Sequence, residues 1–252
     1  KERRFLPGAE GEIRLSDDHG QTWRKVWEHR LLHSRLFLAG GRLYLLGHTA
    51  ERGIYTREDG TQAVRNGHKM GDLAVLRSDD LGQTWSEPSL LTHGERWHQA
   101  ASNLWYKDGN VYLVMERAAY EAVQGWNVNE LAPVLMRARE TDDLRLPESW
   151  TFAKAPAYRD VAPREAMDYF GIPWYDTLDN ESVPVGGGRR CAPMGWLETQ
   201  VVQVVDPNHV WYDPQGKTLH LLMRAHCGRT GYACLMRVLE HPDGTMTTDF
   251  QL

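Results

Sequence analysis

The sequence of 252 residues has few cysteines, no long apolar run and no excess of positive charge. Its three cysteines, Cys191, Cys227 and Cys234, are too few for a disulfide framework, and no CxxC or HxxxH spacing accompanies them, which argues against a zinc site. We interpret them as buried thiols. A bridge between Cys227 and Cys234 is not expected, because a hairpin turned by residues 228–231 would set the two side chains diagonally.

Membrane, nucleic-acid and cofactor functions lack their usual sequence signals. The longest apolar stretch, residues 31–46, is interrupted by charged residues and glycine and falls short of the ~20 residues of a membrane-spanning helix. The net charge of −5 comes from interleaved signs rather than a basic stripe, which argues against a nucleic-acid partner. The glycine run at 186–188 lacks the phosphate-loop pattern GxxxxGK[ST]. We expect no membrane span, no nucleic-acid partner, no metal and no cofactor.

Aromatic residues with a polar group are plentiful. Ten tryptophans and ten tyrosines stand against five phenylalanines, a balance that suits both interlocked β-sheets and surfaces that bind carbohydrate. With 41% apolar residues, the chain has enough apolar surface for a substantial core.

An eight-residue motif, S-x-D-x-G-x-T-W, occurs at Ser16–Trp23 and again at Ser78–Trp85. The aspartate folds its carboxylate onto turn amides, glycine supplies a positive φ, serine and threonine tie the turn, and tryptophan packs inward. The motif predicts a self-stapled β-hairpin turn with a structural role for Ser16, Asp18, Gly20, Thr22, Trp23, Ser78, Asp80, Gly82, Thr84 and Trp85. Asp143 with residues 149–151 is interpreted as a decayed third copy.

Strand patterns repeat around these turns. Apolar stretches at residues 34–38, 100–106 and 199–205 precede glycine-led strands at 41–46, 109–114 and 216–222, and further strands are expected at 13–16, 73–78, 134–139 and 233–239. This order of four strands is that of a propeller blade. Together the patterns predict about four blades of four antiparallel strands each.

The repeated turn resembles the Asp box, or BNR repeat, of sialidases and related propellers. The resemblance implies an all-β, sialidase-like β-propeller whose parent has six blades, whereas a blade of about 60 residues gives only about four here. We therefore expect residues 1–252 to form a single propeller domain that is incomplete at both ends. A complete four-bladed propeller with irregular blades is the alternative.

The expected loops are unevenly distributed between the two rims of the propeller. One rim has tight turns, whereas the other carries residues 49–71, 118–131 and 153–195, which makes the second rim the expected functional face. Polar residues at the strand ends on that rim form the shortlist: Arg3, Arg4, His33, Arg35, His48, Arg96, Trp97, His98, Glu116, Arg117, Glu198, Arg224 and His226.

Two of these residues match the sialidase resemblance more closely. The stretch Glu198–Val202, followed by a strand ending in Arg224, resembles the strand pair that carries a glutamate and one arginine of the family's carboxylate-binding triad. The resemblance implies that Glu198 activates a tyrosine nucleophile and that Arg224 binds the substrate carboxylate. The gap between the two residues is wider than in the family, and the family's Arg-Ile-Pro strand is absent.

Several family positions fall elsewhere or are missing. Arg3 and Arg4 match the E-x-R step that ends the first blade's second strand, and Glu10 is the candidate for the acid/base carboxylate. The nucleophilic tyrosine and the third arginine are expected in later blades, outside this chain. The remaining candidates are His98 as a catalytic group and Arg96, Trp97, Arg117 and His226 as substrate-binding groups, although Trp97 and His98 also suit blade packing.

The function expected first is a sialidase-like glycoside hydrolase that acts on terminal acidic sugars of glycans. Two alternatives stay open. One is a propeller lyase or histidine-assisted hydrolase of uronic-acid polysaccharides, in which His98 and His226 are acid/base groups. The other is a non-catalytic glycan-binding propeller, because the turn motif reports architecture rather than activity. The partner expected is an acidic oligosaccharide, and the resemblance implies a secreted or periplasmic location.

Overall fold

The computed structural model describes residues 11–50, 54–56, 62–64, 70–98, 103–119, 131–162, 183–186, 189–191, 195–226 and 231–251. Nearly all of the regular structure in these ranges is β-strand, with a 3-10 turn at Pro147–Ser149 and one short helix, α1 (Tyr158–Val161). No helix in them is long and apolar enough to cross a membrane.

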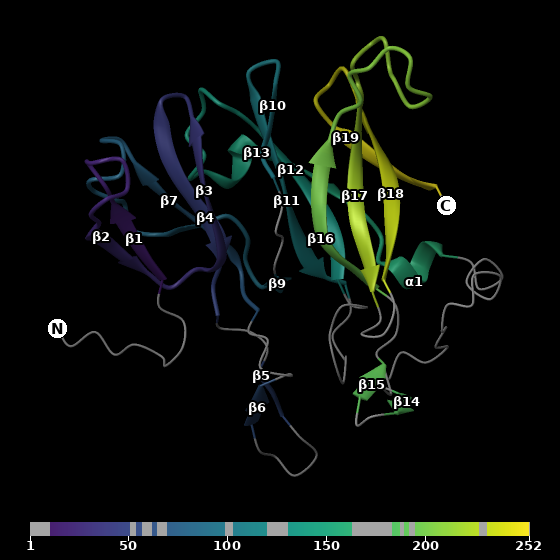
Figure 1. Ribbon diagram of the computed structural model, residues 1–252, viewed down its shortest axis with the longest axis horizontal. Coiled ribbons are helices and arrows are strands. Elements are labelled where there is room, and N and C mark those ends of the chain that lie inside the picture. The colour runs from purple at the N-terminus through teal and green to yellow at the C-terminus, as the bar shows by residue number, and fades with distance from the viewer. Residues whose placement is uncertain are drawn as a thin grey trace.

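Antiparallel sheets follow one another along the chain and stand side by side (Figure 1). The first is a hairpin, and the second is a four-stranded sheet in the order β3-β4-β7-β8. The third has the order β10-β11-β12-β13, with β9 also pairing with β11, and the fourth has the order β16-β17-β18-β19. The bounds are β1 (Gly11–Leu15), β2 (Arg24–His29), β3 (Leu32–Ala39), β4 (Arg42–His48), β7 (Leu73–Ser78), β8 (Ser89–Leu90), β9 (Trp97–His98), β10 (Trp105–Lys107), β11 (Asn110–Ala118), β12 (Leu131–Arg139), β13 (Trp150–Lys154), β16 (Gly195–Val202), β17 (Thr218–His226), β18 (Gly231–Glu240) and β19 (Met246–Gln251).

These sheets are blades of a β-propeller, which confirms the predicted fold class. The predicted strands are present, except that the innermost strand of the fourth blade runs over Gly195–Val202 instead of 199–205. The hairpin β1–β2 supplies the last two strands of the first blade. The innermost strand of the third blade differs from the prediction of one strand over 100–106, because β9 and β10 are separate segments that both pair with β11.

The core lies between blades, where the flat faces of consecutive sheets meet. Leu45 and Leu76 face the first blade, whereas Tyr44 and Leu46 on the same sheet face the third. A third cluster, with Trp196 at its centre, joins the third and fourth blades. Side chains alternate between the two faces of a strand, so a strand buried on both faces has an almost continuous apolar sequence.

The two predicted turns are closed by the same hydrogen bonds. In the second, the Gly82 N–H donates to Ser78 Oγ at 2.8 Å, the Thr84 N–H donates to Asp80 Oδ1 at 2.9 Å, and the Trp85 indole N–H donates to the Gly82 carbonyl at 3.0 Å. The turn at Ser16–Trp23 repeats each of these bonds. The hydrogen bonds to threonine hold the pKa of both aspartates down at about 2.

One expectation for these turns is wrong. Trp85 is buried with 6% of its surface exposed, but Trp23 is 58% exposed. Trp85 packs into the cluster between the first two blades, whereas Trp23 lies at the outer turn of β1–β2, and in the described ranges no further sheet covers it. The decayed third copy keeps part of the pattern, because the Trp150 indole N–H donates to the Leu144 carbonyl at 2.9 Å.

The two rims of the propeller are built differently, as Figure 1 shows. Below the blades project two small hairpins, β5–β6 (Ile54–Thr56, Gln62–Val64) and β14–β15 (Val183–Gly186, Arg189–Cys191). The opposite rim carries the tight turns that open β4 and β11, together with one longer connection over residues 203–217. We call the rim with the inserted hairpins the insertion rim and the other one the turn rim.

Candidate functional site

Three histidines meet at the insertion rim, where β3 begins, β4 ends and β9 lies. His33 Nδ1 and His48 Nε2 are 2.9 Å apart, and the ring of His98 lies 4.8 Å from that of His33 and 6.0 Å from that of His48, centroid to centroid. His48 is fully buried and also hydrogen-bonds the Thr49 carbonyl through Nδ1. Burial, aided by the neighbouring His33, lowers the pKa of His48 to about 4, so the imidazole is neutral at pH 7.

Glu116, near the end of β11, lies beside His98 in the third blade and contacts the fourth blade. Its Cα pairs with that of His98 across the sheet, and its side chain is fully buried. Glu116 Oε1 accepts hydrogen bonds from the Thr199 N–H at 3.1 Å and the Thr199 hydroxyl at 3.2 Å. Burial outweighs these bonds and raises the pKa of Glu116 to about 8, so the group is a neutral carboxylic acid at pH 7.

Glu198 stands at an irregularity of β16. The pairing register with β17 shifts between Leu197 and Gln200, and Glu198 adopts a positive φ of 59°. A β-bulge of this kind redirects side chains that would otherwise alternate regularly. The buried Glu116 carboxyl binds the backbone on this bulge, and its contact with the Glu198 amide is among the influences on its pKa. Glu116 thereby fixes the backbone that carries the Glu198 carboxylate.

Glu198 forms an ion pair with Arg224 of β17. Arg224 Nε lies 3.3 Å from Glu198 Oε2, and both side chains remain about two-fifths exposed. The two residues line a hollow of about 390 Å³, together with the β18 residue Tyr232, whose side chain is 37% exposed. Gln200, Leu222, Met223 and Ala233 complete the lining, so the hollow combines a mainly apolar surface with a carboxylate, a guanidinium and a tyrosine ring.

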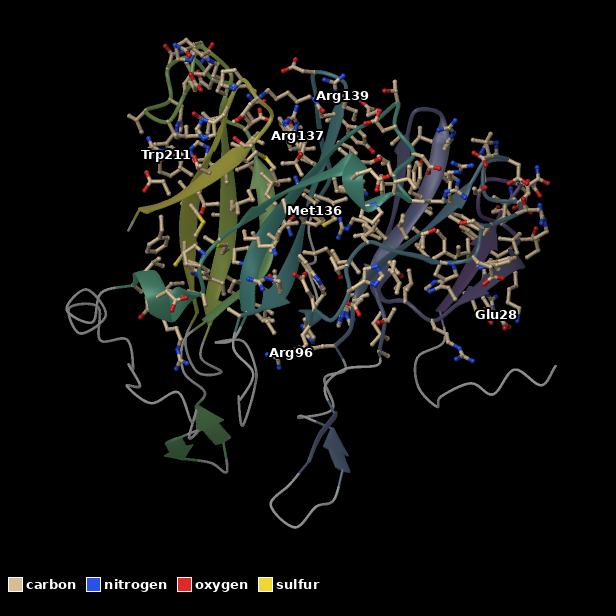
Figure 2. The ribbon with its side chains drawn as sticks, turned by 180° about the vertical axis from the view of Figure 1, so that it is seen from behind. Glu28, Arg96, Met136, Arg137, Arg139 and Trp211 are labelled. Carbon is tan, nitrogen blue, oxygen red and sulfur yellow. The ribbon has the colours of Figure 1, made fainter. Side chains whose placement is uncertain are left out.

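The other sequence candidates are distributed as follows. Trp97 has no exposed surface and donates its indole N–H to Glu95 at 2.9 Å, so it packs between blades. Arg96 projects at the insertion rim (Figure 2), and Arg117 pairs in register with Trp97 on the neighbouring strand. His226 ends β17, where its backbone pairs with Gly195, but its side chain lies outside the described residues. Arg3, Arg4 and Glu10 also lie outside them.

Two residues of the candidate site, Tyr232 and Thr199, were not predicted from the sequence. Tyr232 gave no signal: the register of β17 and β18 pairs it with Ala225, one position beyond Arg224, and that register is not visible in the local sequence. Thr199 contacts Glu116 across 83 positions of sequence, and only the bulge of β16 brings it there. In the described part of the chain, no group of three or more His, Cys, Asp and Glu side chains is arranged to hold a metal ion.

No family model matches the sequence, and no curated protein matches it. Among solved structures, the chain is similar to an α-L-arabinanase of Penicillium chrysogenum (13% identity, TM-score 0.44, covering 99% of this chain and 60% of that one). It is also similar to an α-L-arabinofuranosidase of Lactobacillus brevis (12% identity, TM-score 0.43, covering 89% of this chain and 59% of that one). Two complexes of a Trypanosoma rangeli sialidase are similar as well (12% and 13% identity, TM-scores 0.39 and 0.38, covering 97% of this chain and 35% and 34% of those chains). The chain spans about three fifths of the first two proteins and about a third of the sialidase. Because all these TM-scores lie below 0.5, they lend no support to a shared function.

Proposed function

We propose that this chain is the glycan-cleaving part of a glycoside hydrolase that removes terminal acidic sugars, as a sialidase does. One observation carries the proposal: Glu198, Arg224 and Tyr232 line a single hollow on the fourth blade. A secreted or periplasmic setting, where such glycans are found, is part of the same proposal.

Arg224 is suited to hold the carboxylate of an acidic sugar. A guanidinium offers five N–H donors in a planar fork, and the contact of Nε with Glu198 leaves the terminal amino groups for a ligand. The ion pair with Glu198 also fixes the direction of the guanidinium before substrate arrives, which lowers the entropy that binding has to overcome.

Glu198 and Tyr232 supply the groups for a two-step cleavage with retention. Glu198 takes the phenol proton, the phenolate oxygen attacks the anomeric carbon, and the glycosidic C–O bond breaks. The departing oxygen takes up a proton from an acid, the role predicted for Glu10 from the sequence. Water then releases the sugar from the tyrosine. Glu116 acts as a positioning residue in this scheme, because it binds the backbone of the bulge behind Glu198.

The proposal is tested by release of a fluorescent leaving group from a 4-methylumbelliferyl sialoside. We expect Glu198→Gln and Tyr232→Phe to lower kcat by about 100-fold or more, because each removes a group that takes part in proton transfer or attack. Arg224→Ala should chiefly raise KM, since it removes the contact with the substrate carboxylate. The matched control is Tyr106→Phe, which removes the hydroxyl of an exposed tyrosine on the turn rim. Turnover that survives all three substitutions would refute the site.

The histidine cluster favours a second candidate, cleavage of uronic-acid polysaccharides with histidine as acid or base. His33, His48 and His98 converge at the insertion rim, and His33 is exposed there. The same assay with a uronoside separates the two candidates. Turnover confined to the uronoside and lost in His33→Gln would support the second one, whereas inactivity on both substrates with retained glycan binding would support a non-catalytic propeller.

A further inference from the structure

The connection between β16 and β17 on the turn rim is held in a fixed shape by its own hydrogen bonds. Asp213 accepts from the Gln215 and Lys217 N–H groups and from the Thr218 hydroxyl at 2.8–2.9 Å. The Trp211 N–H donates to His209 Nδ1 at 3.1 Å. A segment fixed in this way pays little conformational entropy when it binds a partner.

This connection presents aromatic surface to solvent. Trp211 is 50% exposed and Tyr212 is 37% exposed, and both line a pocket of about 330 Å³ with Asp213, Thr218, His220 and Arg237. Figure 2 places Trp211 at the opposite rim from Arg96. The pocket shares no lining residue with the hollow at Glu198, although Leu235 of the pocket pairs with Leu222 of the hollow across β17 and β18. Its volume lies at the lower end of the range for small-ligand sites.

The floor of the pocket is polar. The His220 ring lies 5.7 Å from that of Trp211 at an angle of 32°, and only 3% of the residue is exposed. Among the residues that the structure describes, neither His220 Nδ1 nor Arg237 Nε has a hydrogen-bond partner. Both atoms are buried beneath the lining, so they make the floor polar without themselves being open to a ligand.

The charges of the pocket are already balanced. Arg237 pairs with Asp249 at 2.5 Å, and both oxygens of Asp213 are engaged within the turn. Burial, together with the charges of Arg237 and His209, lowers the pKa of His220, so its ring is neutral at pH 7. No uncompensated charge among the described lining residues calls for an acidic ligand.

We propose that this pocket is a second glycan site that binds one neutral sugar residue, with the ring face of the sugar stacked on Trp211. An indole face suits the C–H face of a pyranose, and the phenol, hydroxyl and guanidinium groups around it suit its hydroxyls. The inference does not depend on the proposed hydrolase. A neutral glycan bound here would anchor a polymer on the turn rim, away from the chemistry at the insertion rim.

The test is isothermal titration of the purified protein with three neutral oligosaccharides, xylohexaose, arabinohexaose and lacto-N-tetraose, and with 3′-sialyllactose. We expect at least one neutral sugar to bind, and Trp211→Ala to weaken its affinity by about tenfold, the effect of losing one aromatic contact of favourable geometry. Val205→Ser is the matched control, since Val205 is 69% exposed on the same connection but does not line the pocket, and its affinity should equal that of the wild type.

A further arm distinguishes this site from the hollow at Glu198. Glu198→Gln should leave neutral-sugar binding unchanged, whatever becomes of sialoside turnover. The inference is overturned if no neutral sugar binds, if Trp211→Ala binds as well as the wild type, or if only sialyllactose binds. It is also overturned if sedimentation shows that the wild type self-associates and that Trp211→Ala abolishes this, because Trp211 would then serve a protein contact.

Discussion

Glu116 is the residue whose burial has the largest consequence for the behaviour of the protein with pH. The unfolded chain loses the proton of this carboxyl near pH 4.5, whereas the folded protein keeps it up to about pH 8. Over that interval the folded state binds one more proton than the unfolded state, so the free energy of unfolding falls as pH rises. The stabilisation is complete below pH 4.5, falls progressively as pH rises from 4.5 to about 8, and changes no further above that value.

Replacing Glu116 with glutamine should remove this dependence. The wild type should lose about 1.4 kcal/mol of stability for each pH unit that this group governs, and Glu116→Gln should show a flatter curve between pH 5 and 8 even if it is less stable in absolute value. Urea denaturation at several pH values measures the difference. Glu87→Gln, at an exposed position, controls for the loss of one titratable carboxyl group. Parallel curves for wild type and Glu116→Gln would contradict the burial argument.

At the scale of single elements, comparison of the two repeated turns separates the effect of their hydrogen bonds from the effect of tryptophan burial. They share the same hydrogen bonds and the same indole contact to a glycine carbonyl, but one tryptophan is buried and the other is exposed. Stability that comes from the turn itself should therefore be equal in the two copies, whereas stability that comes from packing should belong to the second alone.

The substitutions Trp85→Ala and Trp23→Ala separate these contributions. We expect Trp85→Ala to cost about 3–5 kcal/mol, because it leaves a cavity between the first two blades, and Trp23→Ala to cost about 1 kcal/mol. Thermal or urea unfolding measures both. Equal losses for the two variants would mean that the turn, rather than the packing of the tryptophan, governs the stability of the element.

The strands and turns could be predicted from the sequence, whereas the contacts between strands and between blades could not. Turn glycines at 41, 109 and 216 lie within two residues of the start of β4, β11 and β17, because a positive φ followed by an apolar run is a local signal. Glu198 and Arg224 were paired from a strand pattern, and neighbouring strands do bring them to 3.3 Å. The exposure of Trp23, the role of Thr199 and the place of Tyr232 depend on register, on a bulge and on which blade covers which, none of which is local.

At the scale of the whole molecule, consecutive blades are tied by polar links as well as by apolar cores. The Asn103 amide, ahead of β10, donates to the Val201 carbonyl at 2.7 Å and accepts from the Val201 N–H at 2.9 Å. The Asn103 N–H donates to Gln200 Oε1 at 2.8 Å. On the turn rim, the Tyr112 hydroxyl and Lys107 of the third blade both contact Glu240 of the fourth.

Loss of the Asn103 side chain should loosen the third and fourth blades from one another. Asn103→Ala leaves both backbone groups of the buried Val201 without a partner, so we expect it to cost about 2–4 kcal/mol and to speed amide hydrogen exchange at Val201. Asn208→Ala, at an exposed site on the turn rim, should change stability by no more than about 0.5 kcal/mol. Unchanged exchange at Val201 would show that the apolar core alone holds the two blades.

The left-handed backbone of Glu198 restricts how this position can evolve. A glutamate at a φ of 59° costs roughly 1–2 kcal/mol, a cost that glycine would relieve and that aspartate or asparagine would reduce. Glycine and asparagine discard the carboxylate, and aspartate shortens its reach to Arg224 by one methylene. On the catalytic role proposed for Glu198, a selection for thermal tolerance would therefore favour substitutions at position 198 that a selection for turnover would reject. The residue found at this position in related chains would show which of the two selections acted on them.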